Sequence, residues 1–138
     1  RRGERPAMII GTLLALAVGL FGTATGLDRD RAFYPTVTIV IAAIYVLFAV
    51  MGGSHEALVI ESLVGSAFVV VAVVGFRSSL WLVVAALAAH GMFDFFRGSA
   101  IANPGVPAFW PSFCLAYDLV AAGYLAWLLG CGRLRASA

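Results

Sequence analysis

The chain has 138 residues, of which 62% are hydrophobic and 12% are charged, and its mean hydropathy is +1.00. Soluble domains carry about 25% charged residues, so this composition excludes an ordinary soluble protein and predicts a single-domain integral membrane protein. The formal net charge is only +2 and the nine basic residues, all arginine, are scattered, which excludes a nucleic-acid-binding surface.

Five apolar segments predict an all-α integral membrane bundle with short loops. They cover about residues 7–27, 36–52, 57–75, 80–97 and 110–130. A transmembrane helix needs about 20 residues to cross a hydrocarbon core of about 30 Å, and the second segment is at the short limit. The first segment follows a basic start but is longer than the apolar region of a signal peptide, so we interpret it as a retained span.

Small residues recur every three or four positions along the first segment: Gly11, Ala15, Gly19, Gly22 and Gly26. Such a stripe lets helices in a membrane approach closely. This face is therefore predicted to pack against another helix. The charged run at residues 28–31 that follows is expected to be a solvated turn.

Ionisable residues inside the later segments are the main candidates for function. Glu61 lies near the start of the third segment. His90 and Asp94 are four residues apart in the fourth segment and so share one helical face, as do Cys114 and Asp118 in the fifth. An ionisable residue within a span costs about 2.5–3.5 kcal/mol on insertion scales and usually faces the bundle interior with a partner.

Depth along the helices predicts that these groups meet. Five spans place the two termini on opposite sides, so Glu61, His90, Asp94 and Asp118 all fall in the half of the membrane nearest the N-terminus. We therefore predict one polar pocket that opens toward that side. Six residues are expected at its periphery: His55, Glu56, Arg97, Cys114, Tyr45 and Tyr117.

Three chemistries suit such a pocket. The first is a divalent metal site, because imidazole and carboxylate groups bind zinc, iron or manganese; the candidate ligands are His90, Asp94, Asp118 and Glu61. The second is proton or small-cation handling, since buried carboxylates and histidines form proton relays. The third is acid–base catalysis on a lipid-soluble substrate by the His90–Asp94 pair, although no nucleophile motif such as Gly-x-Ser-x-Gly accompanies it.

The same polar residues can instead hold helices together. Polar contacts between transmembrane helices are worth about 0.6 kcal/mol on average. The chain would then be an accessory or assembly subunit of a larger membrane complex, with the glycine stripe as a docking surface. The expected partners are the lipid bilayer and either further copies of the chain or a larger membrane complex.

Three short motifs stand out in the second half: His90-Gly91-x-x-Asp94, Asn103-Pro104-Gly105-Val106-Pro107 and Trp110-Pro111-x-Phe113-Cys114-x-x-x-Asp118. Together they resemble an uncharacterised group of small bacterial polytopic membrane proteins. The resemblance implies a bacterial inner-membrane protein and no particular activity. In similar sequences one or two histidines often follow the aspartate, where this chain has Phe96-Arg97, and this departure removes potential metal ligands.

Arginine distribution gives only a weak prediction of orientation. The N-terminal side has four arginines (Arg1, Arg2, Arg5 and Arg97) and the other side has the remaining five. Because three of the four precede the first span, which usually dominates topology, we expect the N-terminus to be cytoplasmic.

Overall fold

The computed structural model describes residues 3–97 and 100–138, so Arg1 and Arg2, which entered the orientation argument, lie outside the described residues. The prediction of an all-α protein is confirmed in the described part of the chain. Its elements are α1 (Glu4–Thr25), a short 3-10 helix η1 (Leu27–Arg29), α2 (Phe33–Met51), α3 (His55–Arg77), α4 (Trp81–Phe96) and α5 (Trp110–Gly130). Each of the five predicted segments corresponds to one α-helix.

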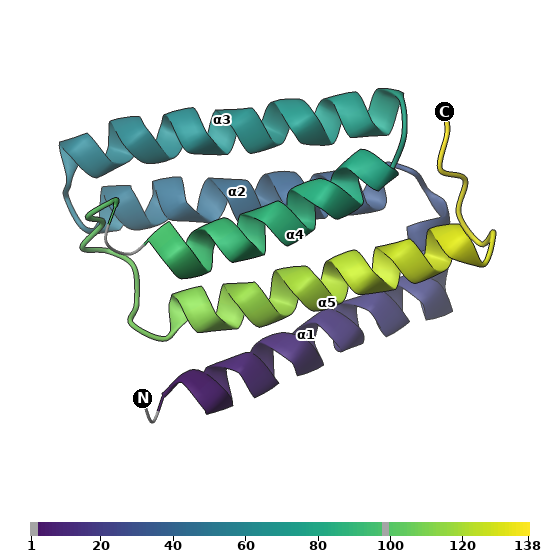
Figure 1. Cartoon of the computed structure of the whole chain (residues 1–138), viewed down its shortest axis with the longest axis horizontal. Helices are drawn as coiled ribbons and strands as arrows, with labels where there is room; N and C mark the ends of the chain where they lie inside the picture. The colour runs from purple at the N-terminus through teal and green to yellow at the C-terminus, as the bar shows by residue number, and fades with distance from the viewer. Residues whose placement is uncertain (1–2, 98–99) are drawn as a thin grey trace.

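Successive helices run in alternating directions, and the two ends of the chain lie at opposite ends of the bundle (Figure 1). The N-terminus, the α2–α3 turn and the α4–α5 connection share one end, which we call the N-terminal end. The α1–α2 turn, the α3–α4 turn and the C-terminal tail share the other, the C-terminal end. This is the arrangement that an odd number of helices predicts.

Four helices, α1, α2, α3 and α5, are long and apolar enough to cross a membrane. The fourth helix in the chain, α4, is apolar but has only 16 residues. At 1.5 Å per residue it is about 24 Å long, shorter than a hydrocarbon core of about 30 Å. Four of the five helices therefore have the length of a full span. The exception is α4, which ends at Phe96, just before the buried Arg97.

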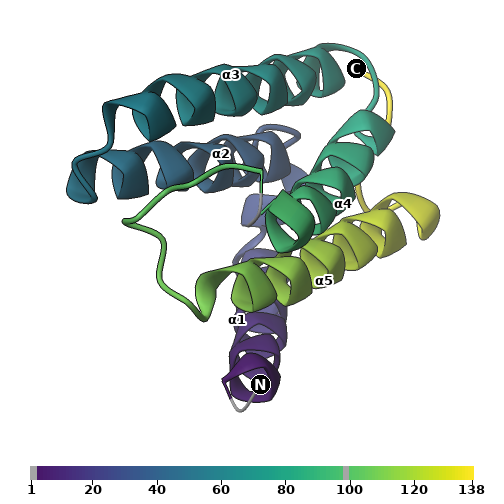
Figure 2. The same ribbon diagram turned by 60° about the vertical axis from the view of Figure 1, so that its left-hand side comes forward.

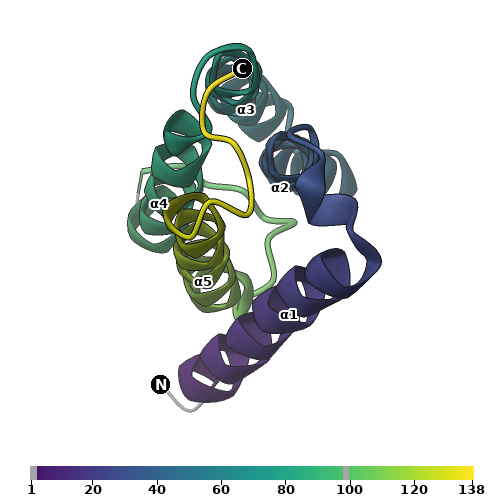
Figure 3. The same ribbon diagram turned by 90° about the vertical axis from the view of Figure 1, so that its right-hand side faces the viewer.

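The glycine stripe of α1 packs against α5. Gly11 faces the backbone oxygen of Phe113 so closely that no Cβ would fit, and Gly19 lies against the ring of Tyr124. Figure 3 shows α1 beside α5, with the N-terminal part of α1 apart from α2 and α3. The remaining main contacts are α2 with α3 and α4 with α5.

The C-terminal tail closes the C-terminal end. Leu80 donates its backbone N–H to Ala136 at 2.8 Å, and Arg31 donates to backbone oxygens of Ala136 and Phe76 at 2.8 and 2.9 Å. The expectation of a solvated turn at residues 28–31 is wrong for Asp28, which is 1% exposed and accepts from Thr23 Oγ1 at 2.5 Å. The helical turn of η1 folds this carboxylate back against α1.

The apolar core occupies the part of the bundle nearer the C-terminal end. Its fully buried members come from α4 and α5 and the residue before α4: Leu80, Val83, Leu87, Leu125 and Leu128. The buried charged residues of α3, α4 and α5 lie nearer the N-terminal end. The bundle is therefore divided along its length into an apolar part and a polar part.

A buried histidine–aspartate cluster as candidate cation site

Three side chains from α4 and α5 form a compact cluster, the His90–Asp94–Asp118 cluster. His90 Nδ1 lies 2.8 Å from Asp118 Oδ2 and 3.1 Å from Asp94 Oδ2. The side chains are 4%, 2% and 0% exposed, in the order His90, Asp94, Asp118. One ligand atom from each residue lies within 4.8 Å of the others, so the group can hold a metal ion.

The local sequence explains the geometry. His90 and Asp94 are one helical turn apart on α4 and therefore point the same way. Gly91 lets α5 come close enough for Asp118 to join them, since a Cβ on Gly91 would lie only 2.8 Å from the Asp118 Cβ. This role of Gly91 was not identified from the sequence, although a glycine next to His90, within a segment otherwise typical of a helix, indicates a close contact between helices.

The cluster has more negative charge than its protein partners balance. A neutral imidazole carries one N–H, and Nδ1 faces two carboxylates that can only accept. The hydrogen bond of Nδ1 is made to Asp118 Oδ2, so among the described residues Asp118 Oδ1 and Asp94 Oδ2, which stands 3.1 Å from Nδ1, make no hydrogen bond. Burying an unpaired carboxylate costs several kcal/mol or more, so the arrangement calls for a further positive charge.

Aromatic rings hold His90 in place. The ring of Phe68 on α3 meets the imidazole edge to face at a centroid distance of 4.8 Å, and Tyr45 on α2 lies 6.3 Å away. Side chains from four helices thus surround the imidazole. The two aromatic rings restrict the rotation of the imidazole.

Glu61 belongs to a second polar group. Its Oε1 pairs with the Arg97 guanidinium and accepts from Asn103 Nδ2 at 3.0 Å, and the Arg97 Cζ stands 4.1 Å from the centre of the Tyr45 ring. Arg97 balances the charge of Glu61, which is not among the grouped metal-ligating atoms. The four central residues of the predicted pocket are therefore divided between two groups.

The six peripheral residues also have different positions. Arg97 is 5% exposed and lines a cavity at the N-terminal end of the bundle. Tyr45 and Glu56 line the same cavity, and Cys114 and Tyr117 line a cavity between α1, α2 and α5. His55, the first residue of α3, is exposed and lines neither cavity.

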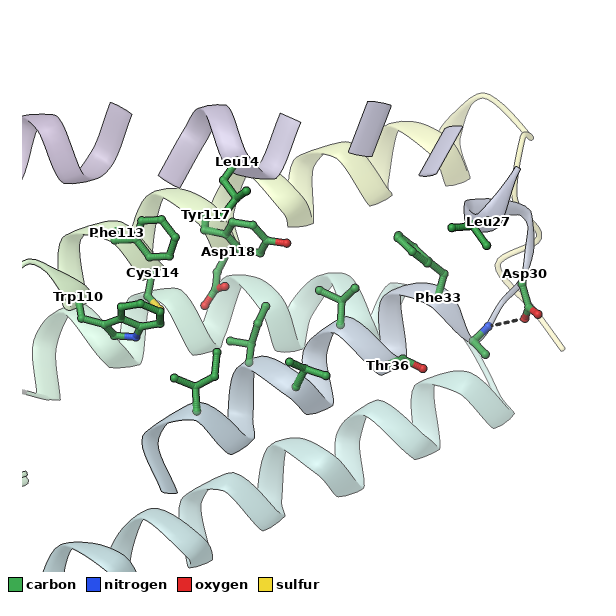
Figure 4. Close-up of a pocket in the computed structure, with 15 residues that line it drawn as sticks. Leu14, Leu27, Asp30, Phe33, Thr36, Trp110, Phe113, Cys114, Tyr117 and Asp118 are labelled. Atoms are coloured by element: carbon green, nitrogen blue, oxygen red, sulfur yellow. Dashed lines mark hydrogen bonds between the residues drawn. The ribbon is translucent and has the colours of Figure 1, made fainter. Parts of the chain in front are cut away.

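Two cavities reach the cluster from different directions. The end cavity, of about 620 Å³, is lined by the α4–α5 connection between residues 101 and 108, and it includes Asp94 and Arg97 in its lining. Figure 2 shows this connection extending toward the end of α2. The lateral cavity, of about 530 Å³, is lined mainly by apolar side chains and includes Asp118 (Figure 4).

The chemistry available at the cluster follows from its donors. One imidazole nitrogen and two carboxylates suit a divalent transition metal, and three protein ligands leave at least one coordination position for water or a substrate. The same groups suit a shared proton. Comparison with protein-family models, curated proteins and solved structures found no match for the chain.

Proposed function

We propose that the chain is an integral protein of a bacterial inner membrane that binds a divalent transition-metal ion at the His90–Asp94–Asp118 cluster. One observation carries the proposal: two deeply buried carboxylates share a single imidazole nitrogen and retain oxygens without a donor among the described residues. A divalent cation neutralises two carboxylates beside a neutral histidine. It also supplies the missing partner for both.

The surface of the bundle supports insertion into a membrane. Large apolar side chains are exposed along the helices rather than buried, among them Ile9, Leu13, Leu20, Leu63 and Val70. Exposed apolar area on this scale is unfavourable in water and favourable against lipid tails. Four helices have the length and hydropathy for a crossing.

Metal analysis tests the site directly. The protein is purified in mild detergent without chelator and compared with an Asp94→Asn/Asp118→Asn variant; we expect about one equivalent of metal in the wild type and none in the variant. Asp28→Asn is the matched control, because Asp28 is an equally buried aspartate outside the cluster. Metal-free wild type, or equal metal in all three proteins, would contradict the proposal.

Proton handling is the second candidate function, and the distances favour it. The separations of 2.8 and 3.1 Å from His90 Nδ1 are hydrogen-bond lengths, whereas ligands at about 2.0–2.1 Å around a tetrahedral metal lie farther apart. A proton shared among the three groups requires no widening of the cluster. In that case wild-type protein in liposomes takes up protons, Asp94→Asn/Asp118→Asn does not, and neither contains metal.

A further inference from the structure

The lateral cavity opens toward the lipid. Its rim includes Leu14 on α1 and Val40 on α2, which are 45% and 57% exposed, and its wall continues along α2 to Phe33. The packing holds it open, because the glycine stripe fixes α1 on α5 while α2 is fixed on α3. A volume of about 530 Å³ is typical of small-molecule sites.

The inner end of this cavity is polar. Asp118 has a buried oxygen without a donor, and Trp110 has a buried indole N–H without an acceptor, among the described residues. Figure 4 shows Trp110, Cys114 and Asp118 grouped at one end of the cavity, with Phe33 and Leu27 at the other. The wall next to this polar end is apolar and includes Ile44, Val40 and Val37, and Asp30 and Thr36 stand at the far end of the cavity. A molecule with its head at Asp118 therefore meets hydrogen-bonding groups at its head and hydrocarbon along the α2 wall.

The polar end of the cavity lies nearer the N-terminal end of the bundle than its apolar wall does. Trp110 begins α5 at the N-terminal end, and Asp118 follows eight residues, about 12 Å, farther in. An amphiphile in the leaflet at the N-terminal end has its head toward that end and its tail toward the membrane centre. Its natural orientation matches that of the cavity.

We propose that the lateral cavity binds a membrane-dissolved amphiphile whose oxygen-bearing head completes the coordination sphere of the metal at the His90–Asp94–Asp118 cluster. The head accepts from Trp110 Nε1, and its hydrocarbon tail lies along the α2 wall from Ile44 to Val37. This inference rests on the proposed metal site and names the ligand class of that site. The end cavity, which reaches Asp94, leaves a separate route for water.

The experiment uses Co²⁺-loaded protein in lipid nanodiscs, because the visible spectrum of Co²⁺ reports a change of ligands. Dodecanehydroxamic acid and the short acetohydroxamic acid are titrated separately into wild type and Val40→Phe, which narrows the cavity. Val70→Phe on α3 is the matched control, since Val70 is 59% exposed and lies outside the cavity. Cobalt content is measured for every protein.

We expect Val40→Phe to raise the half-saturating concentration of the long hydroxamate at least about tenfold, with its cobalt content and its response to acetohydroxamic acid unchanged. Val70→Phe should resemble wild type in all respects. If cobalt binds but Val40→Phe leaves the long-chain titration unchanged, the amphiphile inference is wrong while the metal site stands. If no protein binds cobalt, the proposed metal site itself has failed.

Discussion

At the scale of single residues, Gly91 and Trp110 connect the cluster to its surroundings. Gly91 sets the distance between α4 and α5, and Trp110 has a buried indole N–H without an acceptor among the described residues, which the proposed head group would supply. Neither residue is charged, so a search of the sequence for ionisable residues does not find them. Substitutions at these two positions separate packing from recognition.

Gly91→Ala should weaken both folding and metal binding. The added Cβ lies 2.8 Å from the Asp118 Cβ and 3.4 Å from the Leu115 oxygen, so α4 and α5 must move apart, at an overpacking cost of about 1–3 kcal/mol. Gly123→Ala on α5 is the matched control because nothing lies within 4 Å of its Cβ position. Thermal unfolding in detergent and metal content measure both effects; equal behaviour of the two variants would contradict this account.

Trp110→Phe should retain metal binding and weaken the binding of the amphiphile. The phenyl ring preserves the aromatic contact with Phe48, whose centroid is 5.0 Å away, but removes the indole N–H. Losing one hydrogen bond of about 1 kcal/mol predicts a several-fold weaker long-chain hydroxamate titration. Unchanged affinity with normal cobalt content would show that the indole N–H does not contact the head group.

At the scale of elements, the connection after α4 explains why the four residues that were predicted to meet lie in two groups. Helix faces and depths correctly predicted that His90, Asp94 and Asp118 lie together, because helical periodicity fixes the direction of each side chain. The partners of Glu61 lie beyond the helix, at Arg97 and Asn103, where no periodicity applies. The burial of Asp28 was missed for the same reason, because it depends on a 3-10 turn.

The Arg97–Glu61 pair should behave as a buried ion pair that ties this connection to α3. Arg97→Met leaves a carboxylate that is 2% exposed with only Asn103 as a donor among its described hydrogen bonds, and should destabilise the fold by about 3–5 kcal/mol. Glu61→Leu/Arg97→Met removes both charges and should recover most of that loss. Chemical unfolding distinguishes them, and a double variant as unstable as the single would contradict the assignment.

At the scale of the whole molecule, the bundle has an apolar part nearer the C-terminal end and a polar part nearer the N-terminal end. The proposed site lies in the polar part. The leucine-rich core lies nearer the C-terminal end, while each of the two cavities includes an aspartate of the polar cluster in its lining. Water and amphiphile would then approach the same metal from one leaflet. Which compartment supplies the water depends on the orientation in the membrane, for which the arginine distribution predicts a cytoplasmic N-terminus.

Cysteine labelling in intact cells tests that orientation. Cys131 is exposed just beyond α5 at the C-terminal end, whereas Cys114 is buried, so a membrane-impermeant maleimide should label Cys131 from outside and leave Cys114 unmodified. His55→Cys in a Cys131→Ser background places a thiol at the exposed start of α3, at the opposite end, and should react only after permeabilisation. Labelling of both positions from outside would contradict the alternating arrangement of the helices. The reverse pattern would retain that arrangement but place the N-terminus and the end cavity outside the cell.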